Sequence, residues 1–209
     1  ARLNQVDESR KGSKTQFETF MHRYNNFLPS ATARWCTIEM KLKPFEKWVK
    51  QFFDEGSEVI SYVAIRADEK RLGYKSTNEK LLVKFPFIED NIDKEKVHEI
   101  LDQSGLGLPD YYKWRSRSGC TFCFFQQKIE WVRLSKEHPE AFKRAQKLEK
   151  TALDHDSPFT WCHGETLGEL IEPERVKKIE ADFEKRLERE RKNKEKRLSR
   201  NPFLEDTDL

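Results

Sequence analysis

The sequence predicts an α-rich α/β protein that carries a cysteine-ligated metal subdomain and ends in a charged helix. Two short runs rich in β-branched and aromatic residues, 58–65 and 81–85, lie among longer segments with helical periodicity. Four cysteines are present, two of them in a C-x-x-C pair, and charge is concentrated near the end of the chain. Because 37% of the 209 residues are charged, we expect the core to be confined to part of the chain.

The periodicity places each element in order. Helices are predicted at residues 15–26 and 43–53, the second with Pro44 in its first turn, and residues 29–34 are predicted to form a loop. The strands at 58–65 and 81–85 come next. Asp93 is expected to cap a helix at 94–103 that stops at Gly105. Further helices, predicted at 126–136 and 139–152, follow the C-x-x-C pair, and Cys162 falls in a loop.

Residues 173–200 predict a helix that leaves the domain. Val176, Ile179, Phe183 and Leu187 form one apolar stripe, and the segment holds twelve Lys/Arg against seven Asp/Glu. Such an arm could contact nucleic acid, although helices of mixed sign are more often solvated or bind a partner. We therefore expect four segments: a polar N-terminal segment at 1–14, an α/β segment at 15–110, a cysteine-cluster helical subdomain at 111–170, and the charged arm with an acidic tail at 171–209.

The four cysteines suggest one metal site closed by the fold. Cys120 and Cys123 form the C-x-x-C pair, and the preceding Gly119 permits a close backbone approach. Cys36 lies 84 residues before the pair and Cys162 lies 39 after it. Four thiolates suit either a 4Fe-4S cluster or zinc. In the alternative interpretation, Cys36 and Cys162 are small buried residues and the pair is a redox dithiol.

Cations around Cys36 predict an anion-binding site. Arg34, Lys41 and Lys43 surround it, and the helix expected to start at Pro44 would add its N-terminus. A helix N-terminus with several cations can bind phosphate or sulfate.

A second group of charges follows the first predicted strand. Arg66, Asp68, Glu69 and Arg71 come at the carboxyl end of that strand, where α/β folds bind ligands. In the alternative, these residues only pair with one another in a loop. Residues 111–117 interleave aromatic and basic side chains, which could stack a base or pack around the metal site.

The formal net charge of +3 does not by itself imply nucleic acid or membrane as a partner. No apolar run approaches the roughly 20 residues that a membrane span requires, so no membrane partner is expected. Thiols arranged for a metal predict a reducing cytoplasm. The chain begins at Ala1 and not at methionine, which suggests a piece of a longer protein.

Three motifs together resemble the second half of the phosphoadenosine phosphosulfate (PAPS) reductase family, in order over residues 15–165. They are Arg34-Trp35-Cys36-Thr37 with Lys41 and Pro44, then Ile65-Arg66-Ala67-Asp68-Glu69, then Gly119-Cys120-x-x-Cys123. The resemblance implies a Rossmann-like (adenine nucleotide hydrolase-like) partial sheet, of which residues 15–110 would be the C-terminal half. It also implies nucleotide-dependent sulfur chemistry, either reductive release of sulfite or sulfur transfer to a nucleic acid.

The adenylyl-sulfate reductase branch of this family ligates a 4Fe-4S cluster with a tandem Cys-Cys and a later C-x-x-C. Cys36 matches the first tandem position, Thr37 stands at the second, and we infer that Cys162 replaces the missing ligand. DNA phosphorothioation sulfurtransferases are similar in the run around Cys36. The resemblance further implies that Arg34, Lys41 and Arg66 hold phosphate or sulfate oxygens, with Glu69 orienting Arg66 or a ribose.

This sequence departs from the family in two places. The Ser-Gly-Gly-x-Asp-Ser phosphate loop and the C-terminal Glu-Cys-Gly nucleophile are both absent from it. Without the loop's backbone donors the chain alone should not turn over, so an N-terminal half or a partner subunit would have to supply the adenine nucleotide site.

Two classes of function follow. One is the cluster-bearing part of a sulfur-transfer or reductase enzyme. The other is a zinc-stabilised, non-enzymatic module in which Trp114, Arg115, Arg117 and the arm contact nucleic acid or a protein partner. Within the first, Cys162 is either a ligand or a nucleophile assisted by its neighbour His163.

Overall fold

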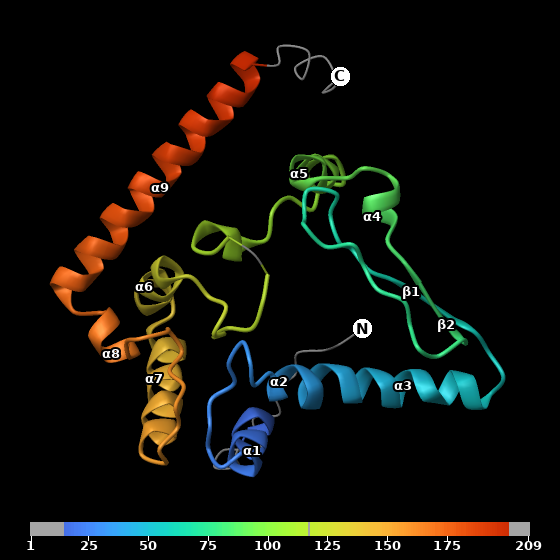
Figure 1. Ribbon diagram of the computed structural model, residues 1–209, viewed down its shortest axis with the longest axis horizontal. Helices are drawn as coiled ribbons and strands as arrows, with labels where there is room; N and C mark the ends of the chain where they lie inside the picture. Colours follow the sequence, from blue (N-terminus) through green and yellow to red (C-terminus); the bar gives the residue numbers. More distant parts are fainter. Residues whose placement is uncertain (1–14, 117, 201–209) are drawn as a thin grey trace. The chain divides into compact units, whose positions relative to one another are not determined.

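The computed structural model describes residues 15–116 and 118–200 (Figure 1). The predictions for residues 1–14, Arg117 and the acidic tail lie outside these residues. The chain separates into two compact units. The helical unit comprises Ala1–Ala33 and Trp114–Leu209, and the sheet unit comprises Arg34–Lys113.

The helical unit is built from α1 (Gln16–Arg23), α6 (Lys128–Glu137), α7 (Pro139–Leu153), α8 (Leu167–Leu170) and α9 (Pro173–Arg200). Helix α6 packs against α7, α8 and α9. Helix α8 also packs against α7 and α9. The largest fully buried side chains of the unit include Trp131, Trp161, Leu134, Leu167 and Leu170. Apolar burial therefore centres on α6, α7 and the loop that leads into α8.

Local capping explains where these helices begin. In α1 the Glu18 N–H donates to Thr15 Oγ1 at 3.3 Å, and Glu18 Oε2 accepts from the Thr15 N–H at 2.7 Å. The same reciprocal pattern joins Thr166 and Glu169 at α8. Pro139 occupies the first turn of α7, where its missing N–H is not needed.

The sheet unit contains α2 (Trp35–Thr37), a π-helical turn η2 (Ile38–Leu42), α3 (Lys43–Asp54), β1 (Val59–Tyr62), β2 (Leu81–Lys84), α4 (Pro86–Glu89), α5 (Lys94–Gln103) and a 3-10 turn η3 (Asp110–Lys113). Strands β1 and β2 pair in parallel, with register from Val59↔Leu81 to Tyr62↔Lys84. The described chain is thus mostly helical with a small parallel sheet, which confirms the α-rich α/β prediction at this level.

The predicted helix at 43–53 is present as α3, with Pro44 in its first turn, but it does not begin at a free N-terminus. The backbone is already helical from Trp35, and the Lys43 N–H donates to the carbonyl of Ile38 in the wide turn η2. A proline inside a helix lacks one donor and clashes with the carbonyl four residues earlier, which a wider turn relieves. The N-terminal dipole expected beside Lys41 and Lys43 is therefore absent, because α3 continues an existing helix.

The parallel sheet leaves apolar side chains open on one face. Along both strands half-buried and exposed residues alternate, and the exposed positions include Ile60, Tyr62 and Leu82. Parallel sheets are ordinarily covered on both faces. None of the helices formed by residues 15–116 and 118–200 combines the length and apolar character that crossing a bilayer takes.

Candidate metal centre

The C-x-x-C pair lies in a turn, the cysteine turn (residues 120–123), that two neighbouring segments hold. Arg115 Nη1 donates to the Cys120 carbonyl at 2.9 Å, and the Gln126 N–H donates to the Cys123 carbonyl at 2.8 Å. A Cβ on Gly119 would lie 3.1 Å from Arg115 Nη2. Glycine at this position therefore gives the guanidinium room to approach the turn.

A buried carboxylate anchors the segment before the cysteine turn. Glu130 of α6 is only 2% exposed and accepts the Ser116 N–H at 2.6 Å, the Ser116 hydroxyl at 2.7 Å and the Gln127 N–H at 3.0 Å. Burial alone would raise the pKa of Glu130, but these hydrogen bonds outweigh burial and lower it. The carboxylate thus ties the chain before the cysteines to the first turn of α6.

A second buried carboxylate holds the Cys162 loop (residues 157–166). Glu149 of α7 accepts the Trp161 N–H at 3.0 Å and the Leu167 N–H at 2.7 Å. Burial raises the pKa of Glu149, although the two N–H groups act in the opposite direction. The indole of Trp161 also donates to the Ala145 carbonyl at 3.0 Å. The loop is therefore fastened to α7 on both sides of Cys162.

An aromatic cluster joins the cysteine turn to the Cys162 loop. Phe122, between the two cysteines of the pair, lies 5.3 Å from Trp161 between ring centroids. Phe17 of α1 contacts both, at 5.8 Å from Phe122 and 6.1 Å from Trp161. Ring pairs at these separations add stability beyond the area they bury. Three of the four cysteines thus belong to segments that pack around one cluster.

The environment of Cys162 favours a protonated thiol. The side chain is buried, and burial, reinforced by the charge of Glu165, raises its pKa to about 12. Glu165 itself binds Arg175 through two bonds of 2.6 and 2.7 Å and also pairs with Lys128. The bond to Arg175 contributes most, and together the two cations lower the pKa of Glu165 to about 2 against the effect of burial.

These facts bear on the two predicted roles of Cys162. A protonated, buried thiol is a poor nucleophile, and His163, its predicted base, has an exposed side chain. Because a metal ligand must also be a thiolate, the protonated thiol does not decide between the two roles, and both stay predictions.

None of the four cysteines forms a disulfide with another described residue, so their chemistry fits a soft metal or a cluster. Cys120, Cys123 and Cys162 lie in the helical unit, and Cys36 lies on α2 in the sheet unit. Over residues 15–116 and 118–200, no group of three or more His, Cys, Asp or Glu side chains is arranged to hold a metal ion. The donor set is suitable and its assembly around a metal stays a prediction.

The charged residues after β1 form ion pairs. Arg66 donates to both oxygens of Asp68 at 2.8 and 3.0 Å and lies 3.6 Å from Glu69, which also pairs with Arg71. The hydrogen bond to Asp68 is the main cause of the raised pKa of Arg66. The pairing expected of the alternative interpretation is present, and the anion-holding roles of Arg66 and Glu69 stay predictions.

The cations around Cys36 share its helical run. Arg34 precedes α2 without a side-chain capping bond, Lys41 lies in the π turn, and Lys43 is the first residue of α3, where its Nζ pairs with Glu39 at 2.6 Å. These residues and Cys36 thus follow one continuous helix in the sheet unit. Their predicted roles in holding phosphate or sulfate are not tested by this arrangement.

Trp114 and Arg115 pack in the interior of the helical unit. Both side chains are buried, the guanidinium lies 5.0 Å from the indole ring, and Trp114 also packs on His138. This packing beside the cysteine turn fits the alternative interpretation, and their contact with nucleic acid stays a prediction. Arg117 lies outside the described residues.

Sequence reasoning missed the two buried carboxylates. Glu149 sits among Phe142, Ala145, Leu148 and Ala152 on the buried side of α7, so a charge on an apolar helix face was a signal for it. Glu130 stands three residues after Gln127 at the start of α6, the spacing of a capping box.

Comparisons of the chain with protein-family models, with curated proteins and with solved structures return no match. The resemblance to the PAPS reductase family therefore rests on the three sequence motifs.

Proposed function

We propose that this chain is the cluster-bearing part of a PAPS reductase-like, nucleotide-dependent sulfur-transfer or reductase enzyme. Cys36, Cys120, Cys123 and Cys162 would be the ligands of a 4Fe-4S cluster. The observation that carries the proposal is the contact of Phe122 with Trp161 at 5.3 Å, since it brings the cysteine turn beside the Cys162 loop. Phe122 and Trp161 lie 39 residues apart in sequence, and a metal bound by Cys123 and Cys162 would hold the same two segments together.

The protein groups around the thiols have defined tasks in this proposal. Arg115 donates to the Cys120 carbonyl, and Glu149 accepts backbone N–H groups on both sides of Cys162, so both segments are ordered before a metal binds. Hydrogen bonds and aromatic burial around a cluster tune its potential and exclude water. When bound, the cluster would supply electron transfer or a place to hold sulfur.

The open face of the sheet unit supports a missing half. Two parallel strands with Ile60, Tyr62 and Leu82 exposed are fewer than a stable parallel sheet requires. Further strands and covering helices from an N-terminal half or a partner subunit would complete a Rossmann-like sheet and supply the adenine nucleotide site. A reducing cytoplasm is the compartment in which such thiols persist.

The anion would then be held by residues of the sheet unit. Arg34, Lys41 and Lys43 come from the helical run around Cys36, and Arg66 comes from the loop after β1. Glu69 would orient Arg66, to which it already lies close at 3.6 Å.

Anaerobic purification followed by analysis for iron, sulfide and zinc tests the proposal. We expect about four irons per chain and a broad visible absorption band. Cys162→Ser should lose most of the iron, whereas His163→Ala, which changes the exposed neighbouring side chain, should keep it. Full iron content in Cys162→Ser would contradict the assignment of this ligand.

A second candidate is a zinc-stabilised module that binds nucleic acid or a protein partner without catalysis. The row of exposed cations along α9 favours it, since an enzyme that handles only small sulfur compounds does not need such a surface. One zinc per chain, with no iron and no colour, would establish this candidate in place of the first.

A further inference from the structure

We propose that the groove between the start of α6 and α9, together with the cations along α9, binds a single-stranded nucleic acid. The inference extends the nucleic-acid contact of the second candidate function and names its residues. Its test measures strand binding and not metal content. Strand binding can therefore fail while the cluster or the zinc site is confirmed, and strand binding can be confirmed while both metal proposals fail.

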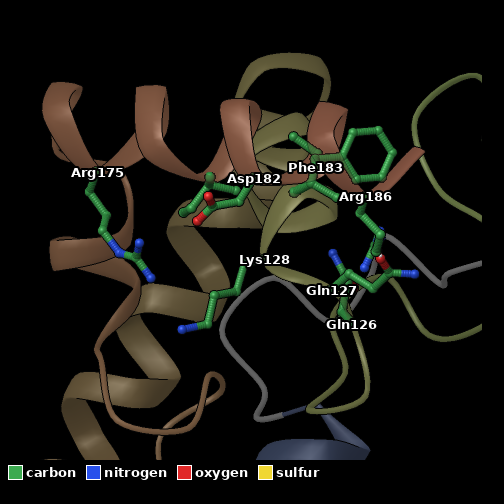
Figure 2. Close-up of a pocket in the computed structure, with 9 residues that line it drawn as sticks. Gln126, Gln127, Lys128, Arg175, Asp182, Phe183 and Arg186 are labelled. Carbon is green, nitrogen blue, oxygen red and sulfur yellow. Dashed lines mark hydrogen bonds between the residues drawn. The ribbon is translucent and has the colours of Figure 1, made fainter. Parts of the chain in front are cut away.

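The groove encloses about 380 Å³ on the surface of the helical unit (Figure 2). It is lined by residues from the two helices: Gln126, Gln127, Lys128 and Ile129 at the start of α6, and Arg175, Ile179, Asp182, Phe183 and Arg186 of α9. Gln126 comes three residues after Cys123, so the groove begins where the cysteine turn ends. A strand in this groove would pass beside the candidate metal centre.

Gln126 is the feature of the groove that calls for a ligand. Its side chain is 6% exposed, and neither Oε1 nor Nε2 has a hydrogen-bond partner among the described residues. A buried amide without partners costs free energy, and native structures rarely leave both of its atoms unpaired. A primary amide donates and accepts side by side, which matches the edge of an unpaired base.

The rest of the groove offers cations and an aromatic ring. Arg186 donates to Gln127 Oε1 at 2.6 Å and lies 5.0 Å from the Phe183 ring, whose other cation neighbour is Arg133 at 4.8 Å. Figure 2 shows Arg175 at the other end of the groove from Arg186 and Phe183, with Lys128 between them. Guanidinium planes held on aromatic rings are surfaces on which bases stack.

A cationic face continues from the groove along α9. It consists of Lys178, Lys185, Arg189, Lys192 and Lys196, all exposed, at spacings of seven, four, three and four residues. These spacings place the five side chains on one side of a helix. Only Lys192 has an ion pair with another described residue, Glu188 at 2.6 Å. The remaining four cations are therefore available to phosphates.

The charge of this surface favours a polyanion over a small anion. Lys128 and Arg175 both pair with Glu165, so the groove itself is nearly compensated. The uncompensated cations lie along α9 over about 27 Å, as the helical rise requires for Lys178 to Lys196. A row of that length matches several successive phosphates of one strand, and a single phosphate would use only one or two of its members.

A single strand suits the surface better than a duplex. Both amide atoms of Gln126 are buried, so its side chain must turn into the groove to meet a base, and an unstacked base of a flexible strand is free to approach it there. Paired bases in a duplex would keep their edges occupied or inside a groove of the nucleic acid.

Fluorescence anisotropy with the full chain and a labelled DNA single strand of about 20 nucleotides tests the inference. We expect the variant Lys178→Gln, Lys185→Gln, Arg189→Gln, Lys196→Gln to bind roughly 100-fold more weakly at 0.15 M salt. Its salt dependence should fall by about 3 in slope, from about 0.7 for each lost phosphate contact. The matched control removes the same charge elsewhere, with Lys47→Gln, Lys94→Gln, Lys147→Gln, Lys150→Gln, and should bind within about twofold of the parent.

Gln126→Met keeps the shape of the side chain and removes its polar atoms. We expect about tenfold weaker strand binding with equal or higher thermal stability, because the unpaired buried amide is gone. Equal losses in the two four-site variants, or none in either, would overturn the proposal. So would a preference for the duplex of the same sequence, or unchanged binding in Gln126→Met.

Discussion

Glu130→Gln should destabilise the chain and do so in a pH-dependent way. The side chain is 2% exposed and accepts three hydrogen bonds at 2.6 to 3.0 Å, from two donors of Ser116 and one N–H of Gln127. An amide offers one acceptor oxygen, so its NH₂ group would face one of these donors. We expect a loss of about 1.5–3 kcal/mol in the free energy of unfolding, the range for hydrogen bonds to a charged group.

The sign of the pH dependence follows from the lowered pKa of Glu130. A carboxylate whose pKa is lower in the folded state contributes stability above its unfolded pKa and loses it as pH falls through the folded pKa. The difference between wild type and Glu130→Gln should therefore be complete at neutral pH and shrink below about pH 4.

Urea unfolding of the full chain, followed at several pH values, measures this difference. Glu137→Gln is the matched control, because Glu137 is an exposed carboxylate on the same helix, and it should change stability by less than about 0.5 kcal/mol. If Glu130→Gln changes the free energy of unfolding at pH 7 as little as Glu137→Gln does, the reasoning is refuted. It is also refuted if the difference between Glu130→Gln and wild type grows as the pH falls.

Two further perturbations test other parts of the structure. Gly73→Ala should destabilise the sheet unit by about 2–4 kcal/mol, because φ is +79° and a Cβ would lie 2.6 Å from the Phe85 ring. The control Gly56→Ala has a similar φ of +84° but open space around the Cβ, so it should cost only about 1 kcal/mol. Equal urea midpoints for the two variants would contradict the close approach to Phe85. In the metal-free chain, iodoacetamide should alkylate the exposed Cys120 at least about tenfold faster than the buried Cys162. Peptide mass spectrometry measures the two rates, and equal rates would mean that the Cys162 loop opens readily.

The elements that could be predicted are those whose ends carry local signals. Helix α5 has the predicted bounds because Asp93 accepts the Lys96 N–H at 2.9 Å and Gly105 follows with φ +73°. Helix α3 begins at Lys43 as predicted, but its continuation from η2 was not foreseen, because proline occurs both in a first helical turn and after a π turn. Local sequence does not separate these two cases.

For the candidate site, the sequence identified donors but not what holds them. The spacing of Cys120 and Cys123 was sufficient to single out the turn. Glu149 acts on residues 12 and 18 positions further along the chain, and Glu130 on a residue 14 positions before it. Contacts at such separations depend on how α6 and α7 pack, which no local pattern contains.

The grip of Glu149 on two backbone N–H groups has a consequence for how the loop moves. Lifting the Cys162 loop away from α7 would leave a buried carboxylate and two buried donors unpaired at once. A partly open loop would therefore be higher in free energy than the closed one, with no compensating contact. The loop should open only in one cooperative step, and the amides of Trp161 and Leu167 should exchange their hydrogens together. Cys162 is in this sense pre-organised, and an incoming ion would not have to order that part of the chain.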